Sequence, residues 1–407
     1  MSTTTSTGAA TATTTRATST ANPTSPKKIY LSFSALRYSE QTQAIDDIAY
    51  PTSVHMLPHT YRNARFGLVS PPRHLMDSLV QEAVQANTVC AHTPAHQQAL
   101  VMAAGNCVFA GMQNRKRQAG GQLDYQAKNK YVQTTQIQAG KLAQMLGTIG
   151  HISADTSACA SSMKALMDAI HLIQLHGFER VAVIAVEDQI SLGVLEFFGD
   201  MHICLSREQL AQGAKPSAFD DTHHGFLMGQ GAALIWLETQ TALERRDQCT
   251  ALPQLRSAVT CGEWCDSPLG QDPQGSGYVR AMQWALQSAG LAAKDIDVIK
   301  THGTGTPLNN VSEAHAIAQV MQHHDFVATS YKPRIGHTLG ASGLIESVLA
   351  IQDATQHRVR GIANRTAHDA RFLSHDVSMQ VNNILALSAG MGNVYGAAVW
   401  SMPSTQG

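Results

Sequence analysis

Two short runs in the chain are apolar along nearly their whole length. They read RVAVIAVED at residues 180–188 and GAALIWLE at residues 231–238. A strand with one face in water alternates apolar and polar residues, so continuous apolar runs of this length predict strands buried on both faces. This feature favours an α/β architecture with buried sheets.

Helical patterns alternate with such strands in both halves of the chain. Residues 161–177 place Met163, Leu166 and Ile173 on one face, and the pattern ends at Gly177, a typical C-terminal cap. Further helices are expected within 71–112, 276–289 and 341–356, and further strands in KKIYLSFSAL, IDVIKTHG and NVYGAAVWSM. The polar stretch 240–252 separates two similar layouts, which predicts one half over 28–245 and a second over 246–407.

Bulk composition excludes several classes of function. The formal net charge of −1 gives no reason to expect nucleic-acid binding. No apolar run approaches the roughly 18 residues that span a bilayer, so we expect a soluble protein. Seven scattered cysteines indicate reduced thiols and a cytoplasmic location. Cys261 and Cys265 have no second ligand pair nearby, so no metal site is expected.

Residues 1–27 form a separate segment, rich in Thr, Ser and Ala and without Asp or Glu. Such a segment buries too little apolar surface to offset the entropy of ordering, so a disordered tail is expected. An organelle transit peptide has a related composition, but a single arginine in the tract is weak support for that alternative.

Chemically capable side chains stand where strands give way to loops. Cys159 lies in ADTSACASS ahead of a helix, His302 lies in KTHGTGTPLNN, and Lys332 and His337 lie in YKPRIGHTLGASG. Taken singly, each has an ordinary structural explanation: a packed histidine, a solvated lysine, a buried thiol. A helix start, however, stabilises a thiolate. Cys, two His and Lys in glycine-rich turns together favour acyl-thioester chemistry.

Five segments, in order and spacing, resemble the signature blocks of the β-ketoacyl-acyl-carrier-protein synthases. The resemblance is to the elongating type II group and the related polyketide ketosynthases, and it covers roughly residues 29–403. The segments are DTSACASS, FDDTHHGFLMGQGAALIWLE, HGTGTPLN, KPRIGHTLGASG and the final loop ALSAGMGN. The resemblance implies a thiolase-like fold, in which two similar α/β halves form a five-layered α-β-α-β-α body that is normally dimeric.

The same resemblance implies a decarboxylative Claisen condensation in fatty-acid or polyketide biosynthesis. Cys159 would accept the acyl chain from an acyl carrier protein, and malonyl-carrier protein would then lose carbon dioxide and attack it. His302 and His337 would stabilise the enolate as N–H donors. Lys332 would stay charged beside them, paired with Glu313. No metal or organic cofactor is implied.

The last loop departs from the family pattern. The family usually has G-F-G-G-T-N, whose phenylalanine gates the pocket, whereas this chain reads SAGMGN from Ser388 to Asn393. Ala389 would stand at the gate and Met391 where glycine is usual, with Gly390 and Asn393 supporting the loop. An amide near Ala389 would complete an oxyanion hole with that of Cys159. The first strand also lacks the family's TG-x-G turn, which together with the loop suggests a specialised enzyme, for example one acting on an unsaturated or aryl-primed polyene chain.

Partners and alternative functions follow from the same resemblance. Arg115, Lys116 and Arg117 are a candidate docking patch for the acidic acyl carrier protein, although they are equally well explained as a solvated loop. The partner chain would be a second copy or a different ketosynthase-like chain. The main alternative function is a chain-length-factor-like subunit with little activity. Such subunits usually lose the nucleophile, so the presence of Cys159 favours an active enzyme.

Two other thiol enzymes are less consistent with the sequence. A true thiolase carries a second catalytic cysteine near its C-terminal end, and no cysteine follows Cys265. A cysteine hydrolase would need a Cys-His-Asn or Cys-His-Asp set. Asn393 could serve in such a set, but the order of the blocks argues against it.

Overall fold

The fold is described from a computed structural model, which covers residues 26–38, 68–69, 93–105, 135–187, 192–222, 225–245, 251–267 and 269–403. The predicted tail 1–27 lies outside these residues except for its last two. Most of the predicted helical segment 71–112 also lies outside them, and the part that is described contains a strand at Gln98–Ala103 instead.

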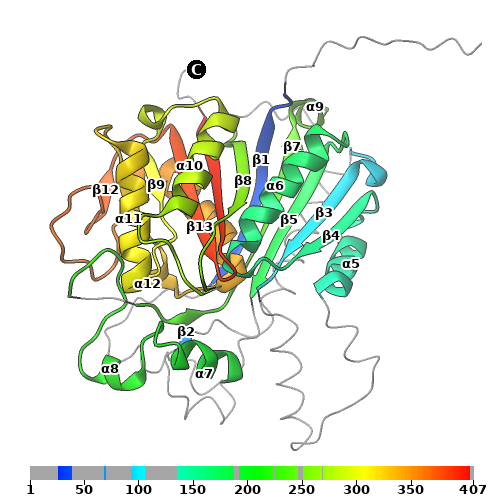
Figure 1. Cartoon of the computed structure of the whole chain (residues 1–407). Coiled ribbons are helices and arrows are strands. Elements are labelled where there is room, and N and C mark those ends of the chain that lie inside the picture. Colours follow the sequence, from blue (N-terminus) through cyan, green and yellow to red (C-terminus); the bar gives the residue numbers. More distant parts are fainter. Residues whose placement is uncertain are drawn as a thin grey trace, which may run out of the picture.

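A ten-stranded sheet runs through the molecule and consists of two halves with the same topology (Figure 1). When the five strands of each half are numbered in chain order, their order along the sheet from the centre outwards is first, fifth, fourth, second and third. The first half contains β1 (Ile29–Tyr38), β7 (Gly231–Thr239), β5 (Arg180–Glu187), β3 (Gln98–Ala103) and β4 (His151–Asp155). The second contains β8 (Gln254–Gly262), β14 (Val394–Ser401), β13 (Asn383–Gly390), β9 (Val298–Lys300) and β10 (Val327–Thr329).

Strand directions repeat between the halves as well. In both, the first two pairings along the sheet are antiparallel and the last two are parallel. The halves join where β1 meets β8 at a single residue pair, Tyr30 opposite Gln254. The prediction of two similar α/β halves is therefore confirmed, whereas the boundary at residue 245 stays a prediction.

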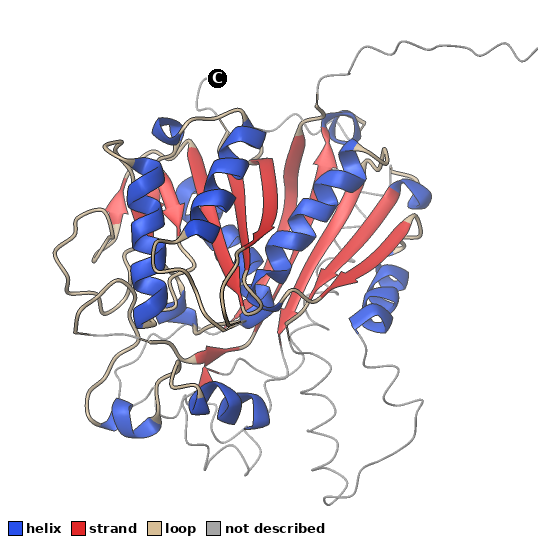
Figure 2. Cartoon of the chain, viewed as in Figure 1, coloured by secondary structure: helices blue, strands red, loops and turns tan. Residues whose placement is uncertain are grey.

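Helices cover both faces of each half-sheet (Figure 2). They are α5 (Thr135–Leu146), α6 (Ser161–Gln174), α10 (Ser276–Ala289), α11 (Pro307–Met321) and α13 (Ser342–Thr355). Side chains alternate across a strand, so each strand shows what lies on its two faces. In β3, Val101 packs with α6 and α13, whereas Leu100 packs with α5. In β14, Trp400 packs with α6 and α13, whereas Val399 packs with α10.

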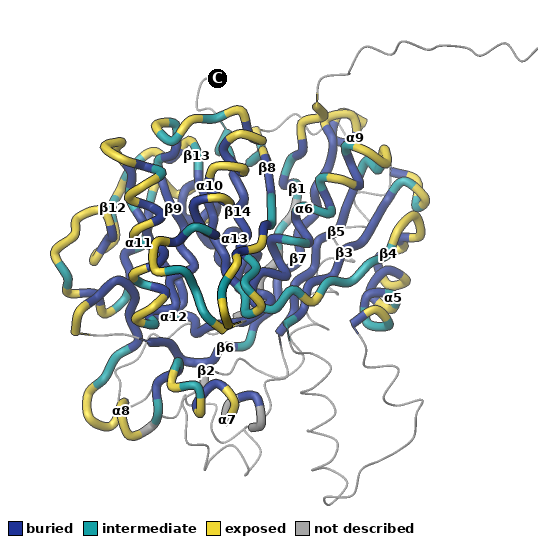
Figure 3. The backbone as a smooth tube through the Cα atoms, viewed as in Figure 1, coloured by how far each residue is buried: buried dark blue, intermediate teal, exposed yellow. Residues whose placement is uncertain are grey.

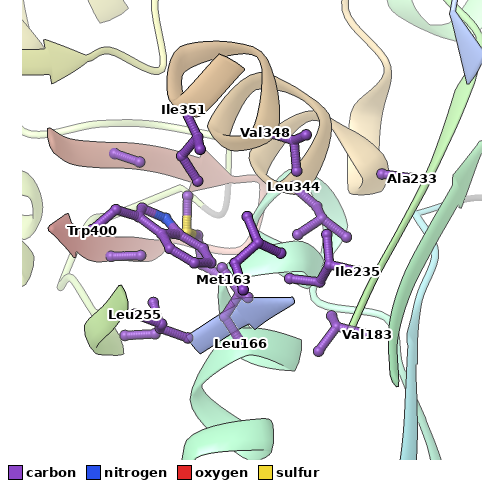
Figure 4. Close-up of a cluster of buried hydrophobic side chains, with 14 of the residues drawn as sticks. Met163, Leu166, Val183, Ala233, Ile235, Leu255, Leu344, Val348, Ile351 and Trp400 are labelled. Carbon is purple, nitrogen blue, oxygen red and sulfur yellow. The ribbon is translucent and has the colours of Figure 1, made fainter. Parts of the chain in front are cut away.

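The central helices α6 and α13 thus lie between the two half-sheets, and α5, α10 and α11 lie outside them. This is the predicted five-layered arrangement. Figure 4 shows the layer between the sheets, where Met163 of α6 and Val348 of α13 meet Ile235 of β7 and Trp400 of β14. The strands β5 and β7, predicted from their apolar runs, are buried along their whole length (Figure 3).

Shorter elements complete the described residues. They are β2 (Leu68–Val69), α7 (Leu192–Asp200), α8 (Arg207–Ala211), β6 (Met228–Gly229), α9 (Gln240–Glu244), α12 (Lys332–Ile335), β11 (Arg358–Val359), β12 (Val377–Ser378) and short 3₁₀ turns. Among the helices of the described residues, none has the length and apolar character needed to cross a membrane. Nor does that part of the chain gather three or more metal-ligating side chains in one place.

Candidate active site

Cys159 lies in a tight turn between β4 and α6. The turn is the 3₁₀ segment Ala158–Ala160, and Ala158 adopts a left-handed backbone with φ of 47°. The thiol is buried, and burial raises its pKa to about 12, although Lys332 opposes the shift. The start of α6 was expected to stabilise a thiolate, but the loss of solvent outweighs that effect. The resting group is therefore a neutral thiol.

The corresponding turn of the second half has the same shape without the thiol. Residues 338–343 read TLGASG where 157–162 read SACASS, and Leu339 repeats the left-handed backbone of Ala158 with φ of 44°. Gly340 occupies the position equivalent to Cys159. The two turns meet directly, because the Ser162 hydroxyl donates to the Gly340 carbonyl at 2.5 Å.

His302 and His337 lie close together in the second half. His302 follows β9, His337 precedes α13, both are buried, and their ring centroids are 5.6 Å apart. The amide N–H of Leu339 donates to Nδ1 of His337 at 3.2 Å, and the Ser342 hydroxyl lies 2.9 Å from the same nitrogen. An Nδ1 that accepts a hydrogen bond leaves the proton of a neutral imidazole on Nε2.

Both imidazoles are uncharged at neutral pH. Burial lowers the pKa of His302 and of His337 well below the usual range, and Lys332 and Lys300 lower them further. Nδ1 of His302 is buried and has no hydrogen-bond partner among the described residues. The site thus offers neutral N–H donors rather than imidazolium ions.

Lys332 is fully buried and holds this part of the site together. Its ammonium donates to the carbonyl of His302 at 2.5 Å and to Glu346 Oε1 at 2.7 Å. The predicted pairing of Lys332 with Glu313 is wrong. Glu313 instead accepts the backbone N–H groups of His302 at 2.5 Å and Gly303 at 2.9 Å. The reason is positional: Glu313 lies on α11, against the turn after β9, whereas α13 brings Glu346 to the lysine.

The glycine-rich loop lies directly against the nucleophile. A Cβ on Gly390 would lie 2.9 Å from the Ser157 carbonyl oxygen and 3.3 Å from the Cys159 amide nitrogen. Only a glycine lets the end of β13 approach the turn this closely.

The prediction that the Ala389 side chain faces the cysteine as a gate is wrong. Strand alternation turns Ala389 toward the cluster of α10, away from the cysteine. Met391, two residues after Ala389, packs instead on the apolar cluster that contains the thiol. We call these residues the cysteine cluster; they are Cys159, Val194, Phe198, Cys204, Phe226, Met228 and Leu339, with Ile203 and Met391 at the edge.

Two domain models of one family match most of this framework. "Beta-ketoacyl synthase, N-terminal domain" matches residues 63–242, and "Beta-ketoacyl synthase, C-terminal domain" matches residues 257–364. Together they match more than half of the chain and include the cysteine turn and both histidines. The chain belongs to the beta-ketoacyl synthase family.

Relatives with curated names agree with this membership. A 3-oxoacyl-[acyl-carrier-protein] synthase 2 from Synechocystis is 30% identical over 227 residues, which are 54% of this chain and 53% of that protein. One from Mycobacterium tuberculosis is 29% identical over 195 residues, 48% of this chain and 46% of that protein. The chain thus spans about half the length of the curated relatives it matches.

Solved structures share the fold over nearly the whole chain. A complex of a type II PKS acyl-carrier protein with its ketosynthase gives a TM-score of 0.78 at 17% identity, covering 93% of this chain and 100% of that chain. A ketosynthase in complex with its chain length factor from Xenorhabdus doucetiae gives 0.71 at 21% identity, covering 92% and 98%. The thiolase-like fold expected for a beta-ketoacyl synthase is therefore confirmed.

The remaining predicted positions of this beta-ketoacyl synthase lie apart from the thiol or outside the described residues. Asn393 closes the turn between β13 and β14, with φ of 59°; its carbonyl accepts the Glu263 N–H at 3.0 Å, and its side-chain amide lies 3.3 Å from the Ser267 carbonyl. The docking candidates Arg115, Lys116 and Arg117 fall outside the described residues.

Two buried residues of the site were missed by the sequence reasoning. Lys300 ends the buried strand β9, and Glu346 lies among buried residues of α13. A charged residue in a buried strand or helix needs a partner, and that was the available signal.

Proposed function

We propose that the protein is a 3-oxoacyl-acyl-carrier-protein synthase. The observation that carries the proposal is the pair of buried, neutral histidines in the same enclosed site as a buried cysteine thiol. A thiol accepts an acyl group by thioester exchange, and N–H donors stabilise the enolate that forms when a malonyl thioester loses carbon dioxide.

In the first step, the Cys159 sulfur attacks the acyl thioester of the carrier protein. A new sulfur–acyl bond forms, the bond to the carrier's thiol breaks, and the proton of the cysteine ends on that leaving thiol. The cysteine cluster surrounds the thiol with Phe198, Phe226, Met228 and other apolar side chains, and this apolar surrounding suits an aliphatic or polyene chain. The chemistry needs no metal or organic cofactor.

In the second step, a malonyl thioester bound near the histidines loses carbon dioxide. The breaking carbon–carbon bond leaves its electron pair as an enolate, whose oxygen would accept the N–H of His337 Nε2 and of His302. The enolate carbon then attacks the acyl-cysteine carbonyl, and the cysteine leaves as a thiolate. Because burial disfavours that thiolate, it takes a proton from solvent water and returns to the resting thiol. Lys332 would hold the His302 backbone throughout.

We further propose that the chain associates with a second chain along the edge of strand β4. Among the described residues β4 pairs only with β3, whereas the equivalent strand β10 is covered through a bridge from Ala328 to Phe372. Met145 and Ile149 add exposed apolar surface beside β4. An open strand edge with apolar surface favours pairing with a second ketosynthase-like chain. The carrier protein would dock separately, with Arg115, Lys116 and Arg117 as candidates.

The free thiols at Cys159, Cys204 and Cys261 are consistent with a cytoplasmic location. We also propose that the boundary between the two halves lies at residue 245. Retention of the cysteine, both histidines and the buried lysine favours an active subunit over a chain-length-factor-like partner.

The test is intact-mass spectrometry of the purified protein after incubation with carrier proteins loaded with chains of different length and unsaturation. We expect an acyl adduct that is absent in Cys159→Ala, and release of carbon dioxide from malonyl-carrier protein. A folded protein that forms no adduct with any chain and releases no carbon dioxide would support the partner-subunit function. Sedimentation of the protein alone and with Met145→Asp tests the pairing across β4.

A further inference from the structure

Lys300 is a fully buried cation that the proposed reaction does not use. It is the last residue of β9, two positions before His302. Burial of an ammonium is costly unless partners compensate it, and burial lowers the pKa of this group. A buried lysine beside a reactive site therefore calls for an explanation.

The contacts of Lys300 tie three elements together. Its ammonium donates to Glu346 Oε2 on α13 at 3.1 Å and to the Leu387 carbonyl on β13 at 2.6 Å. The other carboxylate oxygen of Glu346 receives Lys332 at 2.7 Å. One carboxylate is thus shared by two lysines, and the strand that ends at Gly390, against the cysteine turn, is bonded to one of them.

This arrangement gathers two buried lysines and two buried carboxylates behind the histidines. The charged and titratable groups facing them are Lys300 of β9, Lys332 of α12, Glu346 of α13, Glu313 of α11 and the Cys159 thiol. Glu346 balances one of the two lysines. Glu313 accepts the backbone amides after β9 and acts on both lysines at longer range.

We propose that Lys300 is a positioning residue of this site, which fixes the carboxylate of Glu346 and the end of β13 and adds a second buried positive charge behind the two histidines. This inference deepens the proposed function and rests on it for the reaction itself. The charge adds to burial in keeping both imidazoles neutral, each with one N–H group. The hydrogen bonds keep Lys332 on the His302 carbonyl.

The test replaces Lys300 in the full-length protein. Lys300→Met removes the charge and the hydrogen bonds, Lys300→Gln keeps a donor without the charge, and Lys300→Arg keeps the charge. The first readout is NMR titration of labelled histidines, with His302 and His337 assigned through their Asn variants. The second is the rate of carbon dioxide release from malonyl-carrier protein as a function of pH. Arg180→Lys is the matched control, since it weakens another fully buried ion pair, with Glu238.

We expect the Met and Gln variants to raise both histidine pKa values, because one nearby positive charge is lost. Their decarboxylation rate should fall at least about tenfold, as expected for a displaced donor. Lys300→Arg should keep the wild-type titration even if it reacts more slowly, and Arg180→Lys should change neither readout.

Unchanged histidine titrations in the folded neutral variants would overturn the inference, because a structural lysine would affect only stability or rate. Failure of all three Lys300 variants to fold would also overturn it, by making Lys300 a folding residue. A wild-type protein that releases no carbon dioxide would refute the proposed function alone, because the histidine titrations are read without turnover.

Discussion

Gly390→Ala is the substitution whose effect on the nucleophile follows most directly from geometry. The added Cβ would lie 2.9 Å from the Ser157 carbonyl oxygen, 3.1 Å from the Ala160 nitrogen and 3.3 Å from the Cys159 nitrogen. All three atoms belong to the backbone of the cysteine turn, so no side chain can rotate away. Either the end of β13 or the turn itself has to move by several tenths of an ångström.

The magnitude can be estimated from what such a movement costs. Overpacking of this kind destabilises a protein by about 1–3 kcal/mol. A displacement of the reacting group by about 1 Å lowers a rate by roughly a hundredfold. We expect a smaller displacement here, and therefore acylation of Cys159 that is slower by about ten- to a hundredfold, together with a modest loss of thermal stability.

The assay is single-turnover acylation followed by intact-mass spectrometry, with thermal unfolding of the same samples. Gly262→Ala is a suitable control, because its Cβ would meet no atom closer than 3.9 Å, the Asn393 carbonyl oxygen in the turn between β13 and β14. Its acylation rate should match the wild type. A folded Gly390→Ala protein that acylates at the wild-type rate would refute the reasoning, since the cysteine turn would then tolerate the added methyl group.

Three further predictions concern the remaining parts of the site. His337→Ala should slow carbon dioxide release from malonyl-carrier protein by about a hundredfold, the typical cost of one lost donor, and should leave Cys159 acylation largely intact; equal losses in both assays would contradict a donor role. Because burial raises the pKa of Cys159 to about 12, the thiol is protonated at lower pH, and its alkylation by iodoacetamide should keep rising from pH 7 to 10; a plateau below pH 9 would contradict the assignment. Met391→Gly should speed acylation by long chains severalfold relative to short ones, because it removes a side chain from the edge of the cysteine cluster; an unchanged preference between chains would exclude a gating role for this methionine.

The fold was largely predictable because its signals are local. The apolar runs at 180–188 and 231–238 are the buried strands β5 and β7, and the periodic segment after Cys159 is the central helix α6. Burial on both faces leaves a continuous apolar run, and this pattern survives whatever the neighbouring strands are. Such patterns require no knowledge of which distant segments meet.

The partners of the site residues were not predictable in the same way. The carboxylate for Lys332 had two candidates, Glu313 and Glu346, and only the packing of α13 between the half-sheets decides for Glu346. The direction of Ala389 could have been inferred, because residues 385, 387 and 389 of one strand must share a face. The family loop has its gating phenylalanine at this position, and this comparison led to the wrong prediction for the Ala389 side chain.

The internal repeat explains why the nucleophile and the histidines come from different halves. The two turns before α6 and α13 have the same backbone, yet only the first has room for a side chain at its second position. A Cβ on Gly340 would lie 2.3 Å from the backbone nitrogen of Gly105, whereas the Cys159 side chain packs within the cysteine cluster. The second turn is therefore restricted to glycine by the strand end it packs against. Its chemical contribution comes from His337 instead, three residues earlier, whose Nδ1 the same turn holds through the amide of Leu339. Close packing of two equivalent turns thus produces an asymmetric site from a symmetric fold.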